Sequence, residues 1–347
     1  MPDREAFEHP QHFTDLDGLR GILALSVVFL HYGINSAVLR LSHGYLVGFK
    51  FQLSVDFFFV LSGFVLAFSM RSGRPPIIAF ATKRVFRLVP VHYACLLALL
   101  AISVAAPGPL PYLPNPLPSS TIFADFFLAT PVIWQRDAVN VPSWSVSWEL
   151  YLPILAVMAA PWIASIVGRH SRAIVIVLCA LMAWVAMLVS DGAMLYGARA
   201  CLGLAAGACL FQSRISVPRQ LATPAVLYGL VILMLALMLA SASFPAAAVI
   251  FPVAVFATIL VGARTRSLLS SRPIAWLGSI SYTLYMVHIP VLVAMALVFG
   301  DRINASIGLK GIAIALAIAA ASALTILVER PAMLLGRRLR VRATAIA

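Results

Sequence analysis

Long apolar runs, separated by short polar or basic gaps, make up most of this chain. Ten of them are about as long as a helix that crosses a bilayer, which takes roughly 20 residues. Their approximate limits are residues 20–39, 51–70, 88–106, 143–161, 172–190, 193–211, 222–242, 244–262, 274–298 and 308–328. Because only helices and closed barrels satisfy the backbone within lipid, the pattern predicts an all-α integral membrane protein with about ten transmembrane helices.

The composition also favours a membrane protein. Of the 347 residues, 62% are hydrophobic and 11% are charged, and the mean hydropathy is +0.99. Soluble domains average about 45–50% apolar and about 25% charged residues. These values exclude an ordinary soluble enzyme, a disordered protein and a nucleic-acid-binding domain, although the net charge is +13. The four cysteines lie inside apolar runs without the spacing of a zinc or redox site, so no metal is expected.

The basic residues lie mostly in alternate gaps between the apolar runs. With ten helices, nineteen of the 25 Lys and Arg residues fall on one side and five on the other, while Arg199 lies within a run. Cytoplasmic loops carry the excess of Lys and Arg in membrane proteins. Both termini are therefore predicted to be cytoplasmic. The expected organisation is an N-terminal segment 1–19, a membrane domain 20–331 and a basic tail 332–347.

One connection on the predicted outer side is long. Residues 107–142 begin with a proline-rich stretch, which is typical of a stiff extended chain, and continue with the apolar segment 123–129. Long loops in compact proteins are often functional. A lid or acceptor-binding element on the outer face is one interpretation, and a plain connector is the other.

Five ionisable side chains from five different predicted helices fall in one layer in the outer half of the membrane, if each residue rises about 1.5 Å. They are His31, Asp56, Glu149, Arg199 and His288. Charges inside membrane helices are costly and usually functional. The layer therefore predicts a polar reaction centre, and the alternative is a set of ion pairs that fix helix packing.

Six short motifs are spread in order from about residue 16 to residue 331. They are residues 16–21 (LDGLRG) with His31 following Arg20 after ten residues, 55–64 (VDFFFVLSGF), 84–90 (RVFRLVP), 144–152 (WSVSWELYL), 277–290 (LGSISYTLYMVHIP) and 329–331 (ERP). Together they make the chain similar to the acyltransferase-3 family of integral-membrane O-acyltransferases, many of which modify bacterial surface or secreted glycans. One departure is the single Glu149, where relatives often carry two acids.

Acyl transfer to a hydroxyl needs a base, and His31 is the expected one because imidazole titrates near neutral pH. An acyl-histidine intermediate is the alternative, since histidine can also act as a nucleophile. Asp56 or Glu149 is expected to orient the His31 ring, as a carboxylate does in a catalytic triad.

The donor is expected to be acyl-CoA, and no other cofactor is expected. Arg84 and Arg87 share one helix face near the inner side, and Arg20 lies on the same side, so they can bind the phosphates of CoA. Anchoring to anionic lipid is the alternative role. The expected acceptor or cavity residues are Trp144, Ser147, Arg199, Tyr282, Tyr285 and His288.

The resemblance therefore implies a multi-pass enzyme of the bacterial inner membrane. It is expected to move an acyl group, acetyl by preference, from cytoplasmic acyl-CoA to a hydroxyl of an extracytoplasmic or lipid-linked glycan. Membrane lipids and the glycan acceptor are the expected partners, and no nucleic acid is expected. A multi-span transporter or glycan flippase is the alternative, because a buried polar layer suits one equally well.

Overall fold

The computed structural model describes residues 13–34, 51–106, 108–113, 116–130, 138–188, 193–240 and 245–346. Within these ranges the chain forms helices and turns and no β-strand, apart from one isolated bridge between Leu110 and Leu113. The predicted all-α class is therefore confirmed for the described residues. Parts of the predicted outer loop, and the gaps between the apolar runs near residues 191 and 243, lie outside them.

The described residues are mostly α-helical. The α-helices are α1 (Thr14–His31), α3 (Ser54–Ser69), α4 (Ile77–Ala105), α5 (Ser119–Phe126), α7 (Ser143–Leu188), α8 (Ala193–Gln212), α9 (Pro224–Ala240), α10 (Pro245–Gly262), α11 (Arg272–Ser279), α12 (Ser281–Phe299), α13 (Arg302–Ala305), α14 (Ile307–Leu324) and α15 (Arg330–Ile346). Two 3-10 turns, η2 (Phe51–Leu53) and η3 (Leu268–Ser270), and the π-helical turn η4 (Thr325–Glu329) complete the described elements.

Three of the described helices are long and apolar enough to cross a membrane: Ile77–Ala105, Ser281–Phe299 and Ile307–Arg340. Further apolar helices are shorter, at Ser54–Ser69, Ala173–Met182, Pro224–Leu239 and Ile250–Gly262. These helices fit a membrane protein. The count of ten spans and the cytoplasmic location of both termini stay predictions.

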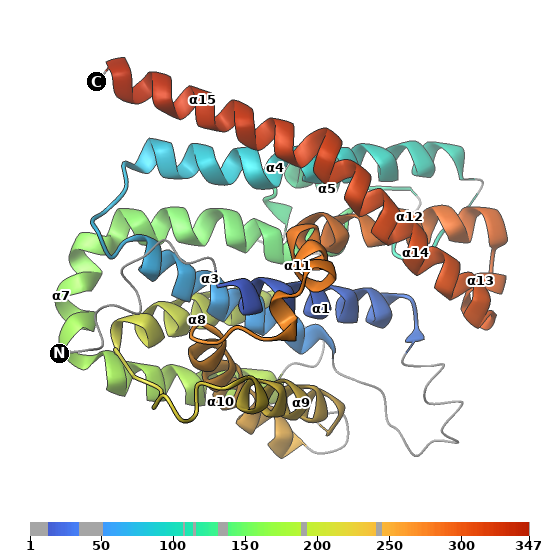
Figure 1. Cartoon of the computed structure of the whole chain (residues 1–347). Coiled ribbons are helices and arrows are strands. Elements are labelled where there is room, and N and C mark those ends of the chain that lie inside the picture. Colours follow the sequence, from blue (N-terminus) through green and yellow to red (C-terminus); the bar gives the residue numbers. More distant parts are fainter. Residues whose placement is uncertain are drawn as a thin grey trace.

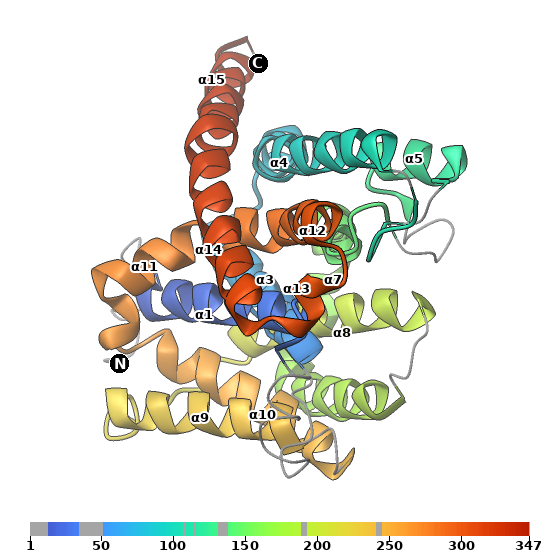
Figure 2. The same cartoon turned by 90° about the vertical axis from the view of Figure 1, so that its right-hand side faces the viewer.

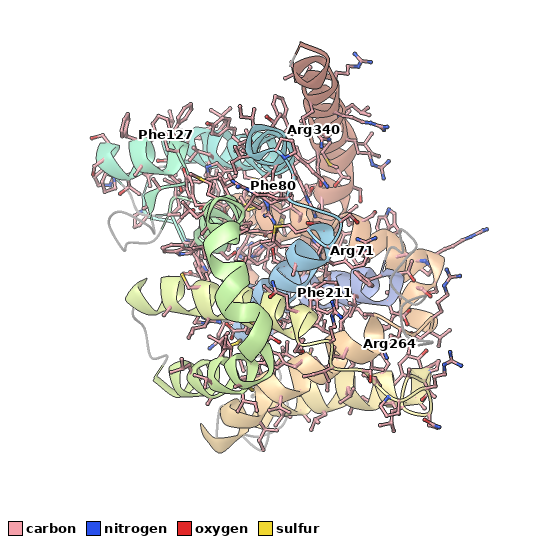
Figure 3. All side chains as sticks on the ribbon, turned by 90° about the vertical axis from the view of Figure 1, so that its left-hand side faces the viewer. Arg71, Phe80, Phe127, Phe211, Arg264 and Arg340 are labelled. Carbon is pink, nitrogen blue, oxygen red and sulfur yellow. The ribbon has the colours of Figure 1, made fainter. Side chains whose placement is uncertain are left out.

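Several predicted boundaries differ from the structure. The runs 143–161 and 172–190 form the single helix α7, whose ribbon doubles back on itself (Figures 1 and 3). Pro161 ends the first run and Gly168 lies between the two runs, and such residues bend helices without ending them. The run 274–298 is instead divided between α11 and α12, and the predicted tail, where it is described, continues as α15 to Ile346. Helix α1 begins at Thr14, earlier than residue 20.

Helix α1 lies in the middle of the bundle, with α4 and α12 on one side of it and α9 and α10 on the other (Figures 1 and 2). One apolar cluster joins α1 to α3, α8, α9 and α10 and contains the buried Phe57, Phe64 and Phe251. A second cluster joins α4, α12 and α14 and contains the buried Val28 and Leu284. The bundle thus has its core on both sides of α1.

Glycines allow two pairs of helices to approach closely, as small residues do in membrane bundles. A Cβ on Gly207 of α8 would lie 1.8 Å from the carbonyl oxygen of Val60 in α3, so a side chain there would clash. A Cβ on Gly21 of α1 would lie 2.6 Å from the backbone nitrogen of Gly278 in α11. The first contact fixes α8 against α3, and the second fixes α1 against the segment that leads into α12.

Candidate active site

His31 of α1 and His288 of α12 lie in direct contact. The Nε2 atom of His288 is 3.0 Å from Nδ1 of His31, and the two ring centroids are 5.0 Å apart. His288 is fully buried, whereas His31 is partly exposed. The hydroxyl of Tyr32 donates to the carbonyl of His288 at 2.9 Å, which ties the end of α1 to α12. The structure thus brings together two of the five ionisable residues predicted to share a layer.

The backbone partners of the two rings assign their protons. Nδ1 of His288 faces the carbonyl oxygen of Leu284 at 3.3 Å, so in the neutral ring this nitrogen carries the hydrogen and Nε2 the lone pair. Nδ1 of His31 faces the carbonyl oxygen of Val27 at 3.1 Å as well as that lone pair, so it also carries a hydrogen. The lone pair of His31 is therefore on Nε2, where a neutral imidazole accepts a proton or attacks a carbonyl carbon.

Asp56 of α3 and Arg199 of α8 form a second buried pair. Nε of Arg199 donates to Oδ1 of Asp56 at 2.9 Å, and Nη2 donates to Oδ2 at 3.1 Å. The guanidinium carbon of Arg199 also lies 5.6 Å from the centroid of a Trp144 ring. Both carboxylate oxygens of Asp56 are thus bound to Arg199. The expectation that Asp56 orients the His31 ring is corrected, because His288 occupies that position.

Tyr285 of α12 lies between the two pairs. Its hydroxyl shares a 2.8 Å hydrogen bond with Ser145, and its ring centroid is 6.1 Å from that of His288. It also interacts electrostatically with Arg199. Ser147 does not join this group, because its hydroxyl donates to the carbonyl of Ser143 one helical turn earlier. Of the two serines, the structure therefore places Ser145 at the site, whereas the sequence analysis chose Ser147.

The three arginines expected to bind the donor form one electrostatic cluster, and Arg20 and Arg84 also interact with Glu149. Nη1 of Arg84 donates to the carbonyl oxygen of Glu149 at 2.6 Å. Arg84 and Arg20 both interact electrostatically with the Glu149 side chain and with Arg87. Arg20 also forms a 3.5 Å ion pair with Asp17. Glu149 therefore lies among the arginines and not on Nδ1 of His31, which corrects the expectation that it orients that ring.

Tyr282 connects α12 to this arginine cluster. Its hydroxyl donates to the carbonyl of Leu88 in α4 at 2.5 Å, and it interacts electrostatically with Glu149, Arg87 and Glu329. Glu329 lies in the π-helical turn η4, where its carboxylate accepts a 2.6 Å hydrogen bond from Thr283. Such π turns occur often at functional sites. The sequence analysis noted Glu329 within a motif but gave it no role.

Sequence reasoning also missed a buried acid in the predicted outer loop. Asp125 of α5 is fully buried, and its carboxylate accepts a hydrogen bond from the Ser143 hydroxyl at 3.3 Å. Its backbone carbonyl oxygen lies 2.8 Å from Nε2 of His92. Burial raises the pKa of the Asp125 carboxyl to about 6. Its contacts tie α5 to the start of α7, which carries Trp144 and Ser145. The only sequence signal was an acid inside the apolar segment 123–129.

Two more residues beside His31 were not singled out for the site. The Nζ atom of the buried Lys310 donates to the carbonyl of Gly33 at 3.0 Å, just beyond the end of α1. The ring of Tyr112 lies with its centroid 5.5 Å from that of His31. Neither position shows a motif in the sequence, because each contact depends on how distant segments pack.

Comparison with known proteins identifies a family. A family model named Acyl_transf_3, described as an acyltransferase domain, matches residues 13–328 of the chain. This range includes both histidines, the Asp56–Arg199 pair and the arginine cluster. No curated protein and no solved structure matches the chain.

Proposed function

This chain belongs to the acyltransferase-3 family of membrane O-acyltransferases, and we propose that it moves an acyl group from cytoplasmic acyl-CoA to a hydroxyl of an extracytoplasmic or lipid-linked glycan. Acetyl is the proposed acyl group, and the bacterial inner membrane is the proposed location. The observation that carries the proposal is the contact between His31 and His288, because it assigns a lone pair to Nε2 of a partly exposed histidine.

In the proposed reaction, Nε2 of His31 takes the proton from the acceptor hydroxyl while the oxygen attacks the thioester carbonyl carbon. The tetrahedral intermediate then loses CoA by cleavage of its carbon–sulfur bond, and the leaving thiolate takes the proton back from His31. The products are an O-acyl ester and free CoA. In the alternative order, Nε2 attacks the thioester carbon first, the carbon–sulfur bond breaks, and CoA leaves as its thiolate while the acyl group rests on His31. The acceptor oxygen then attacks the acyl carbon, the bond to Nε2 breaks, and the hydroxyl proton goes to the CoA thiolate.

His288 is proposed as the residue that positions His31. When His31 gains a proton, its Nδ1–H donates to Nε2 of His288, and the hydrogen bond becomes charge-assisted and stronger. A buried carboxylate has this task in serine-protease triads. The neutral imidazole of His288 holds the His31 ring in the same tautomer without placing a second buried charge beside it.

We place the CoA phosphates at Arg20, Arg84 and Arg87, because guanidinium groups bind phosphate oxygens with forked hydrogen bonds. Arg20 and His31 are both on α1, eleven residues apart, which is roughly 16 Å along the helix axis. A pantetheine arm is long enough to cover such a distance. The thioester then reaches His31 while the nucleotide stays at the arginines.

The test uses purified protein in nanodiscs with radiolabelled acetyl-CoA, added glycan extract and a thiol reagent that detects free CoA. Wild type is expected to release CoA and transfer label, and His31→Ala is expected to do neither while folding normally by size-exclusion chromatography. Label that stays on denatured wild-type protein but not on His31→Ala identifies the acyl-histidine order. Folded wild type that releases no CoA from any short acyl-CoA, with acceptor extracts present, contradicts the proposal.

A further inference from the structure

A tight turn in the predicted outer loop carries an unusual residue. The N–H of Leu113 donates to the carbonyl of Leu110 at 3.1 Å, which closes a β-turn with Pro111 second and Tyr112 third. Tyr112 has a φ of +58°, which is the left-handed conformation that the third position of a type II turn requires. Glycine normally occupies this position, because a Cβ is disfavoured there. Tyr112 therefore occupies a position whose backbone conformation favours glycine.

The Tyr112 side chain is directed at the proposed base. Its ring centroid lies 5.5 Å from that of His31, and the ring planes are 81° apart, so one ring meets the other edge to face. Tyr112 is 42% exposed, whereas Leu113 beside it is 2% exposed and anchors the turn in the core. Strained residues held in place by packed neighbours are frequent at binding sites. The contact with His31 is the feature of this turn that glycine cannot supply.

The position of the turn fits the acceptor better than the donor. His31 lies at the C-terminal end of α1 and Arg20 lies near its N-terminal end, so Tyr112 meets His31 at the end of the helix away from the arginine cluster. An acceptor that approaches from this end passes Tyr112 before it reaches His31.

We propose that Tyr112 is the residue that binds the sugar ring of the proposed glycan acceptor. An exposed tyrosine has an apolar face, which packs on the C–H face of a sugar, and a hydroxyl, which bonds to sugar hydroxyls. A sugar held on this ring presents a hydroxyl to His31. The assignment rests on the proposed acyl-transfer function and adds an acceptor-binding residue to the same site.

The test measures acetyl transfer from acetyl-CoA to a panel of methyl and octyl pyranosides of common hexoses, with the enzyme in nanodiscs. Tyr112→Ala and Tyr112→Gly are expected to raise the KM for an accepted pyranoside at least tenfold, with less than a twofold change in the KM for acetyl-CoA. Tyr112→Phe keeps the aromatic ring and is expected to raise the KM for the pyranoside less than these two variants do. Tyr112→Gly is also expected to unfold at a temperature no lower than wild type, because glycine accepts the φ of this turn.

Phe123→Ala is the matched control, because Phe123 is an aromatic residue of the same predicted loop, is 66% exposed and belongs to α5. It is expected to keep the wild-type KM for the pyranoside. An unchanged KM in Tyr112→Gly, or an equal rise in Phe123→Ala, overturns the assignment while acyl transfer itself stands. Transfer to lipid or water with no pyranoside accepted contradicts the glycan acceptor of the proposed function and leaves Tyr112 no sugar to bind, which overturns the assignment. Failure of acyl transfer itself is distinct, because wild type then consumes no acetyl-CoA at all.

Discussion

Removal of either partner of the Asp56–Arg199 pair is expected to destabilise the protein strongly. The two hydrogen bonds measure 2.9 and 3.1 Å, and the side chains are 5% exposed for Arg199 and 8% for Asp56. Loss of one partner leaves a buried charge unpaired, which typically costs about 3–5 kcal/mol. We therefore expect Asp56→Leu and Arg199→Met each to lower the free energy of unfolding by about 3–5 kcal/mol.

The double variant is expected to lose at least ~2 kcal/mol less than the sum of the single losses, because both charges are then absent. The close glycine contacts between α3 and α8 remain in it. Reversible denaturant unfolding in detergent micelles, followed by circular dichroism, measures all three variants. Arg219→Met, at an exposed arginine, is the control and is expected to stay within about 0.5 kcal/mol of wild type. Additive single losses would refute the reasoning.

Two further predictions concern the donor arginines and the outer loop. Arg87→Ala is expected to raise the KM for acyl-CoA by about 10–100-fold with little change in kcat, since a charge-assisted hydrogen bond contributes about 1.5–3 kcal/mol. Steady-state kinetics measure both constants. A lower kcat with an unchanged KM would show that Arg87 does not bind the donor. For Asp125, burial raises the pKa to about 6 from 3.8, so the folded protein binds this proton more tightly than the unfolded chain. The free energy of unfolding is therefore expected to fall by at most about 3 kcal/mol as pH rises from about 4 to about 6, and Asp125→Asn is expected to lack this decrease in denaturant titrations. Equal pH slopes for the two proteins would contradict the assignment.

Helices were predictable from the sequence because apolar runs specify them directly. Residues 222–242 and 193–211, for example, correspond closely to α9 and α8. The limits of helices were less predictable where a run contained bending residues, as in α7. Four of the residues predicted to share one depth in the membrane do meet, since His31 contacts His288 and Asp56 contacts Arg199. Which residue contacts which could not be predicted, because depth in the membrane does not show which helices are neighbours.

The partner of His31 was wrong in the sequence analysis for a physical reason. Carboxylates orient histidines in known triads, so Asp56 and Glu149 were the natural choices. Arginines compete for these acids, and a buried carboxylate gains more from a guanidinium than from a neutral ring. His288 lies 257 residues from His31 in the chain, so only the packing of α1 on α12 brings the two together. The contact of Tyr112 with His31 was equally hidden, because the proline-rich stretch around Tyr112 predicts an extended chain and not the turn that forms there.

The contact between His31 and His288 carries the central claim, and a double-variant cycle in single-turnover CoA release tests it most directly. The rates of wild type, His31→Ala, His288→Gln and the double variant are compared in nanodiscs with saturating acetyl-CoA and glycan acceptor. Because residues that act as a unit have strongly non-additive effects, the double variant is expected to be no slower than His31→Ala alone. His288→Gln is expected to lower the rate with little change in the KM for acetyl-CoA. Rate losses that multiply in the double variant, or a wild-type rate in His288→Gln, would contradict the account.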